Sequence, residues 1–235
     1  LRLREHGFKR RDADGERFQK LGARPVTVTG NLKGDTQPPP ADLRAVAAIQ
    51  AQIGARRTWA AISTHAGEEA AAARVHTVLK PRHPGLLTIV VPRHPERAGA
   101  LAAEFAAMGL KVVRRSENAR IRPDTDIFLG DTIGEMGFYL RLTEIAFVGR
   151  SLTAEGGQNP LEPAMLGTAV LAGLNVQNFR ESYQRLIANG AAKLVKDREM
   201  LAGAVNFLLN NPKTRQEMIK AGEATVNEMR GALAK

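Results

Sequence analysis

The sequence predicts an α/β fold in which helices cover both faces of a doubly wound parallel sheet of about six strands. Three observations predict this fold. Short apolar runs without polar alternation are typical of strands buried on both faces. Helical segments separate these runs, as in consecutive strand–helix–strand units. Glycine follows several of the expected helices, at Gly109, Gly167 and Gly190, where it ends a helix readily.

The first part of the chain precedes this pattern. A strand is expected at Pro25–Thr29, and Gln37–Pro40 is a polyproline stretch whose fixed φ makes a stiff spacer. The spacer is the predicted domain boundary. It leaves residues 1–36 as a tail and linker, and residues 37–235 as a Rossmann-like domain.

Each later element follows from the same alternation of apolar runs and helical segments. The expected strands are Thr58–Ser63, Leu86–Val91, Lys111–Arg114, Asp126–Leu129, Ile145–Val148, Ala169–Ala172 and Ala192–Val195. The expected helices are the alanine-rich Ala41–Ile53, then Glu68–Lys80, Pro95–Met108, Met136–Leu142, Pro160–Leu166, Phe179–Asn189, Arg198–Leu209 and Pro212–Ala234.

Composition excludes several classes of protein. The 235 residues, 43% hydrophobic and 25% charged, suit an ordinary globular protein with a substantial core. No apolar run approaches the roughly 20 residues that cross a bilayer, and Leu1–Arg4 does not begin a secretory signal. The lack of cysteine excludes disulfides and thiolate chemistry, and suits the cytoplasm. Because the chain does not begin with Met, we expect a fragment.

The formal net charge of +10 requires a partner. Nucleic acid, an anionic membrane face and anionic small molecules are the three candidates. Aromatic residues make up only 5% of the chain, and none alternate with Lys or Arg as stacking platforms would. Nucleic acid therefore ranks third, and no nucleic-acid partner is expected.

Loops after the first two strands of the domain carry candidate ligand groups. Ser63 or Thr64 either caps the next helix or contacts a phosphate or sugar, and the sequence favours neither. Pro92 and Pro95 stiffen the next loop. Arg93 therefore presents its planar guanidinium from a stiff backbone, and this group suits a phosphate or carboxylate. The alternative is a surface ion pair between Arg93 and Glu96, and we favour the ligand role.

A third loop runs into the helix that begins at Met136. Asp131 or Thr132 is expected to cap this helix, with Gly134 and Glu135 in its first turn. Free N–H groups there bind anions or the edge of a base. The alternative is that Glu135 merely complements the helix dipole.

A fourth loop gives the strongest signal. Gly156 and Gly157 free the backbone, Asn159 fits an N-cap, and Pro160 fits the first helical position. Glu162 then lies on the first turn as an acceptor for ribose hydroxyls. Loops of this kind beside fixed acids suit a nucleotide or nucleotide-sugar better than a peptide or lipid.

Other motifs are given no catalytic or metal-binding role. His94 has no visible partner, so a structural role is expected. Asp124-Thr125-Asp126 matches a D-x-D metal motif but precedes its strand, so we interpret it as a turn. No His, Asp or Glu cluster has metal-ligand spacing, and G-x-S-x-G is missing. We therefore expect no protein-bound metal and no cofactor.

These motifs together resemble those of the 3-deoxy-D-manno-octulosonic acid (Kdo) transferases, from about Arg17 onward. The matching segments are Val28–Lys33, Ser63–Glu69, Val91–Arg97, Gly130–Met136, Ile145–Leu152, Gly156–Ala164 and Val176–Phe179.

The resemblance implies the C-terminal domain of a GT-B glycosyltransferase that moves Kdo from CMP-Kdo onto a lipid A precursor. The resemblance also implies that the transfer inverts the configuration at the sugar and needs no bound metal. It further implies that the reaction takes place at the cytoplasmic face of the bacterial inner membrane. Residues 1–36 would then be the tail of the missing acceptor domain, which holds the catalytic base. No residue here would be catalytic, and the fragment alone would be inactive. The residues implied to contact CMP are Pro92, Arg93, Gly134, Glu135, Met136, Asn159, Pro160, Leu161 and Glu162, with Ser63, Thr64, Gly156 and Gly157 as possible additions.

Two alternatives remain open. The domain could bind another donor, a UDP- or GDP-sugar, in the same fold. It could also be a non-enzymatic binder of anions or nucleic acid that depends on its net charge.

Overall fold

A computed structural model describes residues 8–9, 19–22, 27–28 and 37–231 of the chain. The chain divides into two compact units, Leu1–Gln37 with Val226–Lys235, and Pro38–Thr225. In the smaller unit, β1 (Phe8–Lys9) pairs in parallel with β2 (Thr27–Val28). The strand expected at Pro25–Thr29 is present over Thr27–Val28, and its other positions lie outside the described residues.

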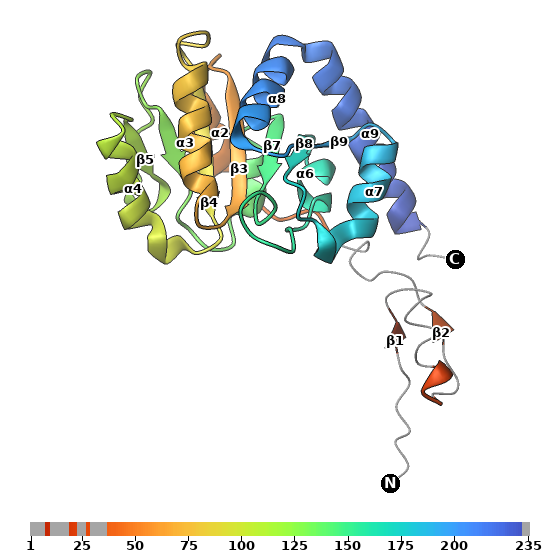
Figure 1. The fold of residues 1–235 in the computed structure, drawn as a ribbon. Coiled ribbons are helices and arrows are strands. Elements are labelled where there is room, and N and C mark those ends of the chain that lie inside the picture. The colour runs from red at the N-terminus through yellow and green to blue at the C-terminus, as the bar shows by residue number, and fades with distance from the viewer. Residues whose placement is uncertain (1–7, 10–18, 23–26, 29–36, 232–235) are drawn as a thin grey trace. The chain divides into compact units, whose positions relative to one another are not determined.

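The larger unit is built on a parallel sheet of seven strands in the order β5-β6-β4-β3-β7-β8-β9 (Figure 1). The strands are β3 (Thr58–Thr64), β4 (Leu87–Pro92), β5 (Val112–Arg114), β6 (Ile127–Leu129), β7 (Ile145–Val148), β8 (Ala169–Ala172) and β9 (Ala192–Leu194). Each coincides with a strand expected from the sequence. The sheet is therefore doubly wound and parallel as predicted, and its seven strands are the seven segments expected from the sequence, close to the stated total of about six.

The helices connect these strands, and α3 packs against α4 and α8 while α2 packs against α5 (Figure 1). Their bounds are α2 (Leu43–Ile53), α3 (Glu68–Leu79), α4 (Ala98–Ala107), α5 (Met136–Leu140), α6 (Leu161–Met165), α7 (Arg180–Ala188), α8 (Arg198–Asn210) and α9 (Pro212–Gly231). Short 3₁₀ turns are η2 (Pro95–Arg97), η3 (Arg115–Glu117) and η4 (Gln177–Phe179). The expected helix Pro95–Met108 is thus a 3₁₀ turn followed by α4, since such turns are frequent at helix N-termini.

The core lies between the sheet and its helices. Every residue of β4 is buried, as expected of a strand covered on both faces. Trp59 on β3 is 0% exposed, and its indole N–H has no hydrogen-bond partner among the described residues. Leu79 of α3 and Leu208 of α8 belong to the same apolar cluster. Burial of large apolar side chains is the main stabilising contribution, at roughly 25 cal/mol per Å².

The polyproline stretch is fixed against α5 at its start in the larger unit. A Cβ at Gly137 would lie 2.4 Å from the Pro39 carbonyl oxygen and 2.3 Å from that of Pro40. Arg141 donates from Nη1 to the Pro39 carbonyl at 3.0 Å. Glycine is therefore needed at 137 because the proline backbone crosses the helix there.

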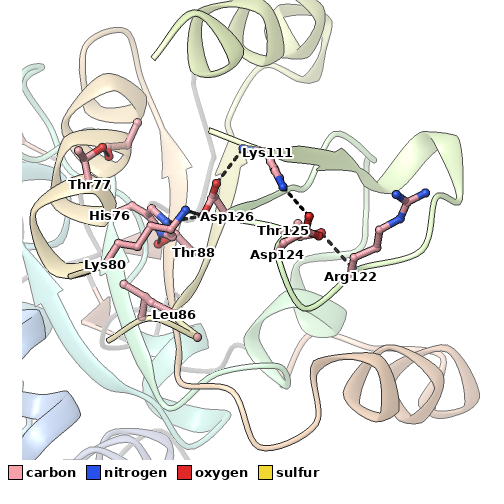
Figure 2. Close-up of polar contacts among 12 residues, drawn as sticks. His76, Thr77, Lys80, Leu86, Thr88, Lys111, Arg122, Asp124, Thr125 and Asp126 are labelled. Atoms are coloured by element: carbon pink, nitrogen blue, oxygen red, sulfur yellow. Dashed lines mark hydrogen bonds and ion pairs between the residues drawn. The ribbon is translucent and has the colours of Figure 1, made fainter. Parts of the chain in front are cut away.

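A buried polar cluster lies at the opposite edge of the sheet from the strand ends discussed below, and Figure 2 shows it. His76 bonds the Thr88 hydroxyl through Nδ1 at 2.9 Å and an Asp126 oxygen through Nε2 at 3.2 Å. Lys80 contacts the same Asp126 oxygen at 2.5 Å, and the Lys111 N–H donates to the other at 2.9 Å. Burial lowers the pKa of His76, although Asp126 opposes the shift. The cluster joins α3, β4 and β6 and is a structural element.

Candidate functional site

The sheet extends from β3 in two directions. On one side of β3 the sheet continues with β4, β6 and β5, and on the other side with β7, β8 and β9. The strand order therefore reverses at β3, which makes it a topological switch point. The loops that follow β3, β4 and β7 leave the carboxyl ends of adjacent parallel strands, where ligands bind in open α/β sheets. The structure therefore brings together three of the four loops predicted from the sequence, and the loop after β6 follows the strand beside β4.

Arg93 is presented at this edge as an exposed side chain directly after β4. Its backbone N–H donates to the Thr64 carbonyl at 2.9 Å, which ties the loop after β4 to the end of β3. No hydrogen bond or ion pair holds its guanidinium within the described part of the chain. Glu96 instead contacts Nδ1 of His94 at 3.4 Å, so the alternative ion pair between Arg93 and Glu96 is not found.

Glu162 is a half-buried carboxylate in the first turn of α6. Burial raises its pKa, while the hydrogen bond from Asn159 and the positive charge of Arg93 act against that rise. The Asn159 amide donates to Glu162 Oε1 at 3.2 Å, and its own oxygen accepts from the Leu161 N–H at 3.1 Å. The predicted N-cap at Asn159 and first helical position at Pro160 are each one residue early, because Pro160 is the N-cap and α6 begins at Leu161. Asn159 lies just before that N-cap and still accepts from the first helical N–H.

Gly156 and Gly157 are buried rather than exposed to a ligand. A Cβ at Gly156 would lie 2.6 Å from the Asn178 side chain, and one at Gly157 would lie 2.9 Å from the Asn175 carbonyl oxygen. Both have positive φ, at 114° and 73°. Close packing of the chain on itself therefore accounts for glycine at these two positions.

The backbone N–H groups of these two glycines are also bonded within the chain. The Gly156 N–H donates to the Gln177 side chain at 3.1 Å, and the Gly157 N–H donates to the Arg150 carbonyl at 2.7 Å. These two N–H groups stabilise the loop.

Of the two alternatives left open for Ser63 or Thr64, helix capping is wrong. Gly67 precedes α3, and no side chain caps this helix. Thr64 is fully buried, and its hydroxyl donates to Glu69 Oε1 at 3.1 Å. Ser63 adopts a left-handed φ of 51°. The Thr64 hydroxyl donates to a buried carboxylate instead of accepting from the backbone N–H groups of α3, and a bond to an ionised acceptor is the stronger kind.

The capping role expected of Asp131 is also wrong. Asp131 accepts from Arg114 Nε at 2.9 Å and from the N–H and hydroxyl of Ser116 at 2.8 and 2.6 Å. Although burial opposes ionisation, these hydrogen bonds lower the pKa of Asp131. This carboxylate therefore binds the segment after β5, a role that local sequence did not reveal.

The remaining residues of the third loop make other contacts. Thr132 bonds Glu135 and the Tyr139 hydroxyl, so it does not cap α5 either. Glu135 precedes α5 instead of lying in its first turn, and Arg115 pairs with it at 2.9 Å. Gly134 has a φ of 80° and open space around it, and Met136 begins the helix as predicted. A ligand can approach the backbone at Gly134.

Sequence reasoning gave no separate role to two acids that the structure buries completely. Glu68 and Glu69 begin α3, each 1% exposed. Arg97 Nη1 contacts Glu69 Oε1 at 2.7 Å, and Glu68 accepts only backbone N–H groups. Two adjacent acids after a glycine were the available signal, but such acids are also typical of an ordinary helix start.

The interpretation of Asp124-Thr125-Asp126 as a turn is confirmed. The Thr125 N–H donates to the Arg122 carbonyl at 3.1 Å, and Asp124 pairs with Lys111 at 2.5 Å (Figure 2). Within the residues that the structure describes, no group of three His, Cys, Asp or Glu side chains could hold a metal ion. The expected structural role of His94 remains a prediction; its ring lies 5.8 Å from that of His65, edge to face. Over the same residues, no helix is long and apolar enough to cross a membrane.

Comparison with known proteins gives matches in sequence and in structure. The chain is 38% identical over 228 residues to the 3-deoxy-D-manno-octulosonic acid transferase of Bordetella pertussis, covering 94% of this chain and 52% of that protein. It is 34% identical over 223 residues to the enzyme of the same name from Haemophilus influenzae, covering 93% and 52%. The chain thus spans about half the length of these curated relatives. No protein-family model matches it.

A solved structure matches the fold. The C-terminal CMP-Kdo binding domain of WaaA from Acinetobacter baumannii superposes with a TM-score of 0.74 at 27% sequence identity. The match covers 78% of this chain and 96% of that domain.

Proposed function

This chain is related to the 3-deoxy-D-manno-octulosonic acid (Kdo) transferases and corresponds to their C-terminal half, and we propose that it binds the CMP-Kdo donor of an inverting GT-B glycosyltransferase. The whole enzyme would transfer Kdo to a lipid A precursor during lipopolysaccharide assembly. The single observation that carries the proposal is the arrangement of Arg93 and Glu162 at the switch point. Arg93 is a guanidinium that makes no hydrogen bond or ion pair within the described part of the chain, and Glu162 is a half-buried carboxylate whose pKa is raised by burial and lowered by the positive charge of Arg93.

The two side chains suit the two chemically different parts of CMP. A guanidinium binds a phosphate in a planar, two-pronged fashion, and prolines keep the Arg93 loop stiff before the ligand arrives. A carboxylate accepts hydrogen bonds from ribose hydroxyls. Glu162 therefore holds the ribose, and Arg93 holds the phosphate.

The remaining contacts surround these two groups. Pro92, Gly134, Glu135, Met136, Asn159, Pro160 and Leu161 complete the proposed CMP site. Thr64, Gly156 and Gly157 stabilise the loops of this site through the hydrogen bonds described above, and Ser63 precedes Thr64 in β3.

The donor half assists the reaction through the leaving group. Negative charge on the departing phosphate grows as the bond between the sugar and the phosphate oxygen breaks, so a cation there binds the transition state more tightly than the ground state. Arg93 supplies that cation. We assign this role to Arg93 alone because α6 has only five residues and the Leu161 N–H is already bonded to Asn159.

The acceptor hydroxyl would be deprotonated by a base on the half of the enzyme that this chain does not contain. This chain alone should bind CMP and transfer nothing. Its basic charge of +10 would favour an anionic membrane, consistent with action at the cytoplasmic face of a bacterial inner membrane on a lipid acceptor. No nucleic-acid partner is proposed.

Titration of the chain with CMP, UMP and GMP tests the proposal. A ligand selective for the native state raises the free energy of unfolding by about 2.7 kcal/mol at 100 times its Kd. CMP should raise the melting temperature most, and Arg93→Ala and Glu162→Ala should each abolish most of that rise.

Two exposed residues away from the crevice serve as matched controls. Arg82 follows α3 at the other edge of the sheet, and Glu104 lies on α4. Arg82→Ala and Glu104→Ala should respond to CMP as the parent chain does. Preference for UMP or GMP would indicate a different donor. Binding that ignores Glu162→Ala but falls steeply with salt would indicate a general anion or nucleic-acid binder.

A further inference from the structure

Glu68 is a buried carboxylate surrounded by backbone N–H groups. Its Oε2 accepts from the N–H groups of His65 and Arg150, at 2.9 and 2.7 Å. Its Oε1 accepts from those of Ser151 and Leu152, both at 2.9 Å. Both oxygens are therefore fully used, and the side chain is 1% exposed.

These N–H groups belong to two different loops. His65 follows β3, whereas Arg150 to Leu152 follow β7, its neighbour in the sheet. Glu68 thus joins the loops on the two sides of the switch point through one side chain. A hydrogen bond to an ionised acceptor is shorter and roughly twice as strong as a neutral one, so this junction is rigid.

The backbone at the junction is held in unusual conformations. Ser63 and Arg150 both have left-handed φ values, 51° and 54°, which non-glycine residues rarely adopt. A Cβ at Gly149 would lie 2.5 Å from the Ser63 carbonyl oxygen and 2.8 Å from Glu68 Oε2. Conformations of this kind persist only where the surroundings enforce them, and Glu68 bonds directly to the N–H of Arg150.

Hydrogen bonds continue from this junction toward both parts of the proposed CMP site. The Arg150 carbonyl accepts from the Gly157 N–H at 2.7 Å, and Arg150 Nε donates to the Glu155 carbonyl at 2.9 Å. These bonds fix the loop that leads into Glu162. On the other side, the Thr64 carbonyl accepts from the Arg93 N–H.

We propose that Glu68 is a positioning residue for donor binding, which sets the distance between the Arg93 loop and the Glu162 loop without touching the nucleotide. The inference rests on the proposed function. An amide cannot replace this carboxylate, because one of its two ends is an NH₂ donor and would face two N–H donors in either orientation. Glu68→Gln therefore loosens both loops.

Glu69→Gln is the matched control. Glu69 is the adjacent residue, equally buried, and also begins α3, but its partners are the Thr64 hydroxyl and Arg97. If Glu68 merely stabilised the fold, both variants would lower the melting temperature, and the two folded variants would bind CMP with the same affinity. If Glu68 positions the loops, only Glu68→Gln lowers the affinity.

The experiment measures CMP affinity by calorimetry, melting temperature, and hydrogen exchange of the amides at Arg93 and at Arg150–Leu152. Glu68→Gln should weaken CMP binding about tenfold or more, since small misplacements of binding groups have large effects. Exchange at these amides should accelerate. Glu69→Gln should change affinity less than about threefold at a comparable loss of melting temperature. Equal affinity losses in the two variants would overturn the inference, as would unchanged exchange in Glu68→Gln.

Two further outcomes keep this test separate from that of the function. If the parent chain does not bind CMP, the proposed function fails, and the exchange measurement still decides whether Glu68 holds the two loops. If Glu68→Gln does not fold, Glu68→Asp takes its place. The shorter carboxylate keeps both acceptors, so an intermediate CMP affinity supports the inference and parent-like affinity contradicts it.

Discussion

Glu162 carries a charge that the folded protein disfavours. Burial raises its pKa above the ordinary value of 4.5, and the bond from Asn159 and the charge of Arg93 only partly compensate. The native state therefore holds the proton more tightly than the unfolded chain does. Stability from this group is present below pH 4.5 and is lost as pH rises through the higher, native pKa.

Glu162→Gln should consequently stabilise the chain at neutral pH. The variant removes the cost of burying the charge, so its melting temperature should exceed that of the parent at about pH 7–8 and approach it near pH 4. CMP affinity should fall in the same variant. Scanning calorimetry across this pH range measures the difference.

The exposed Glu104→Gln variant is the control for this measurement and should show no such pH-dependent difference. A Glu162→Gln chain that is less stable than the parent at neutral or mildly alkaline pH would mean that the carboxylate contributes to folding after all.

Residue types alone identified some of these positions and missed others. Arg93 between prolines and Asn159 before a proline were proposed as site residues because their local sequence restricts the backbone, and this role stays a prediction. Thr64 and Asp131 were expected to cap helices and do not. Their actual partners, Glu69 and the segment after β5, are supplied by the folded structure. A capping side chain bonds whichever partner the tertiary fold supplies, and no local pattern reveals that partner.

At the level of elements, the strands were easier to predict than the helices. The strands β4, β6, β7 and β8 are short apolar runs in which every residue is buried, and a run of this kind is typical of a strand covered on both faces. Helix ends depend on bonds from neighbouring segments. The expected helix Met136–Leu142 ends at Leu140, and Pro160–Leu166 is present only over Leu161–Met165.

Two glycines in helices are predicted to respond oppositely to alanine. Gly137→Ala places a methyl group against two proline carbonyls and should destabilise by about 1–3 kcal/mol. Gly203 lies within α8, where a Cβ would have no neighbouring atom within 4 Å, so Gly203→Ala should stabilise by about 0.5–1 kcal/mol. Thermal melts resolve both, because about 1 kcal/mol corresponds to about 2–4 °C for a domain of this size.

The sign of the difference between these two variants is the decisive result. If Gly137→Ala were as stable as Gly203→Ala, the polyproline stretch would not lie against α5 in solution.

For the whole molecule, the site is assembled from loops that are distant in sequence. Arg93 and Glu162 interact because the order of strands places β4 and β7 on either side of β3. The expectation of a doubly wound sheet was enough to predict that strand ends meet at one edge. It did not predict the junction at Glu68, since that depends on three consecutive N–H groups turning toward one carboxylate.

The net charge of +10 predicts a second kind of association that is separate from the CMP site. The chain should bind vesicles that contain anionic phospholipid at low salt and should not bind purely zwitterionic ones. Each Lys or Arg near the surface contributes about 1 kcal/mol, and salt screens that contribution. Sedimentation with vesicles measures it.

Glu162→Ala separates the two kinds of binding. It should leave vesicle binding unchanged while CMP binding is lost. Equal binding to zwitterionic and anionic vesicles would contradict an electrostatic association.

Trp59 has a practical consequence as the single tryptophan of the sequence. Its indole is shielded from solvent within the central strand of the sheet, so its fluorescence should be emitted at short wavelength in the native state and shift to the red on denaturation. The residue lies near the amino end of β3, away from the edge where Arg93 lies. This intrinsic fluorophore therefore reports unfolding of the sheet without a label, and its native spectrum should be insensitive to the nucleotide.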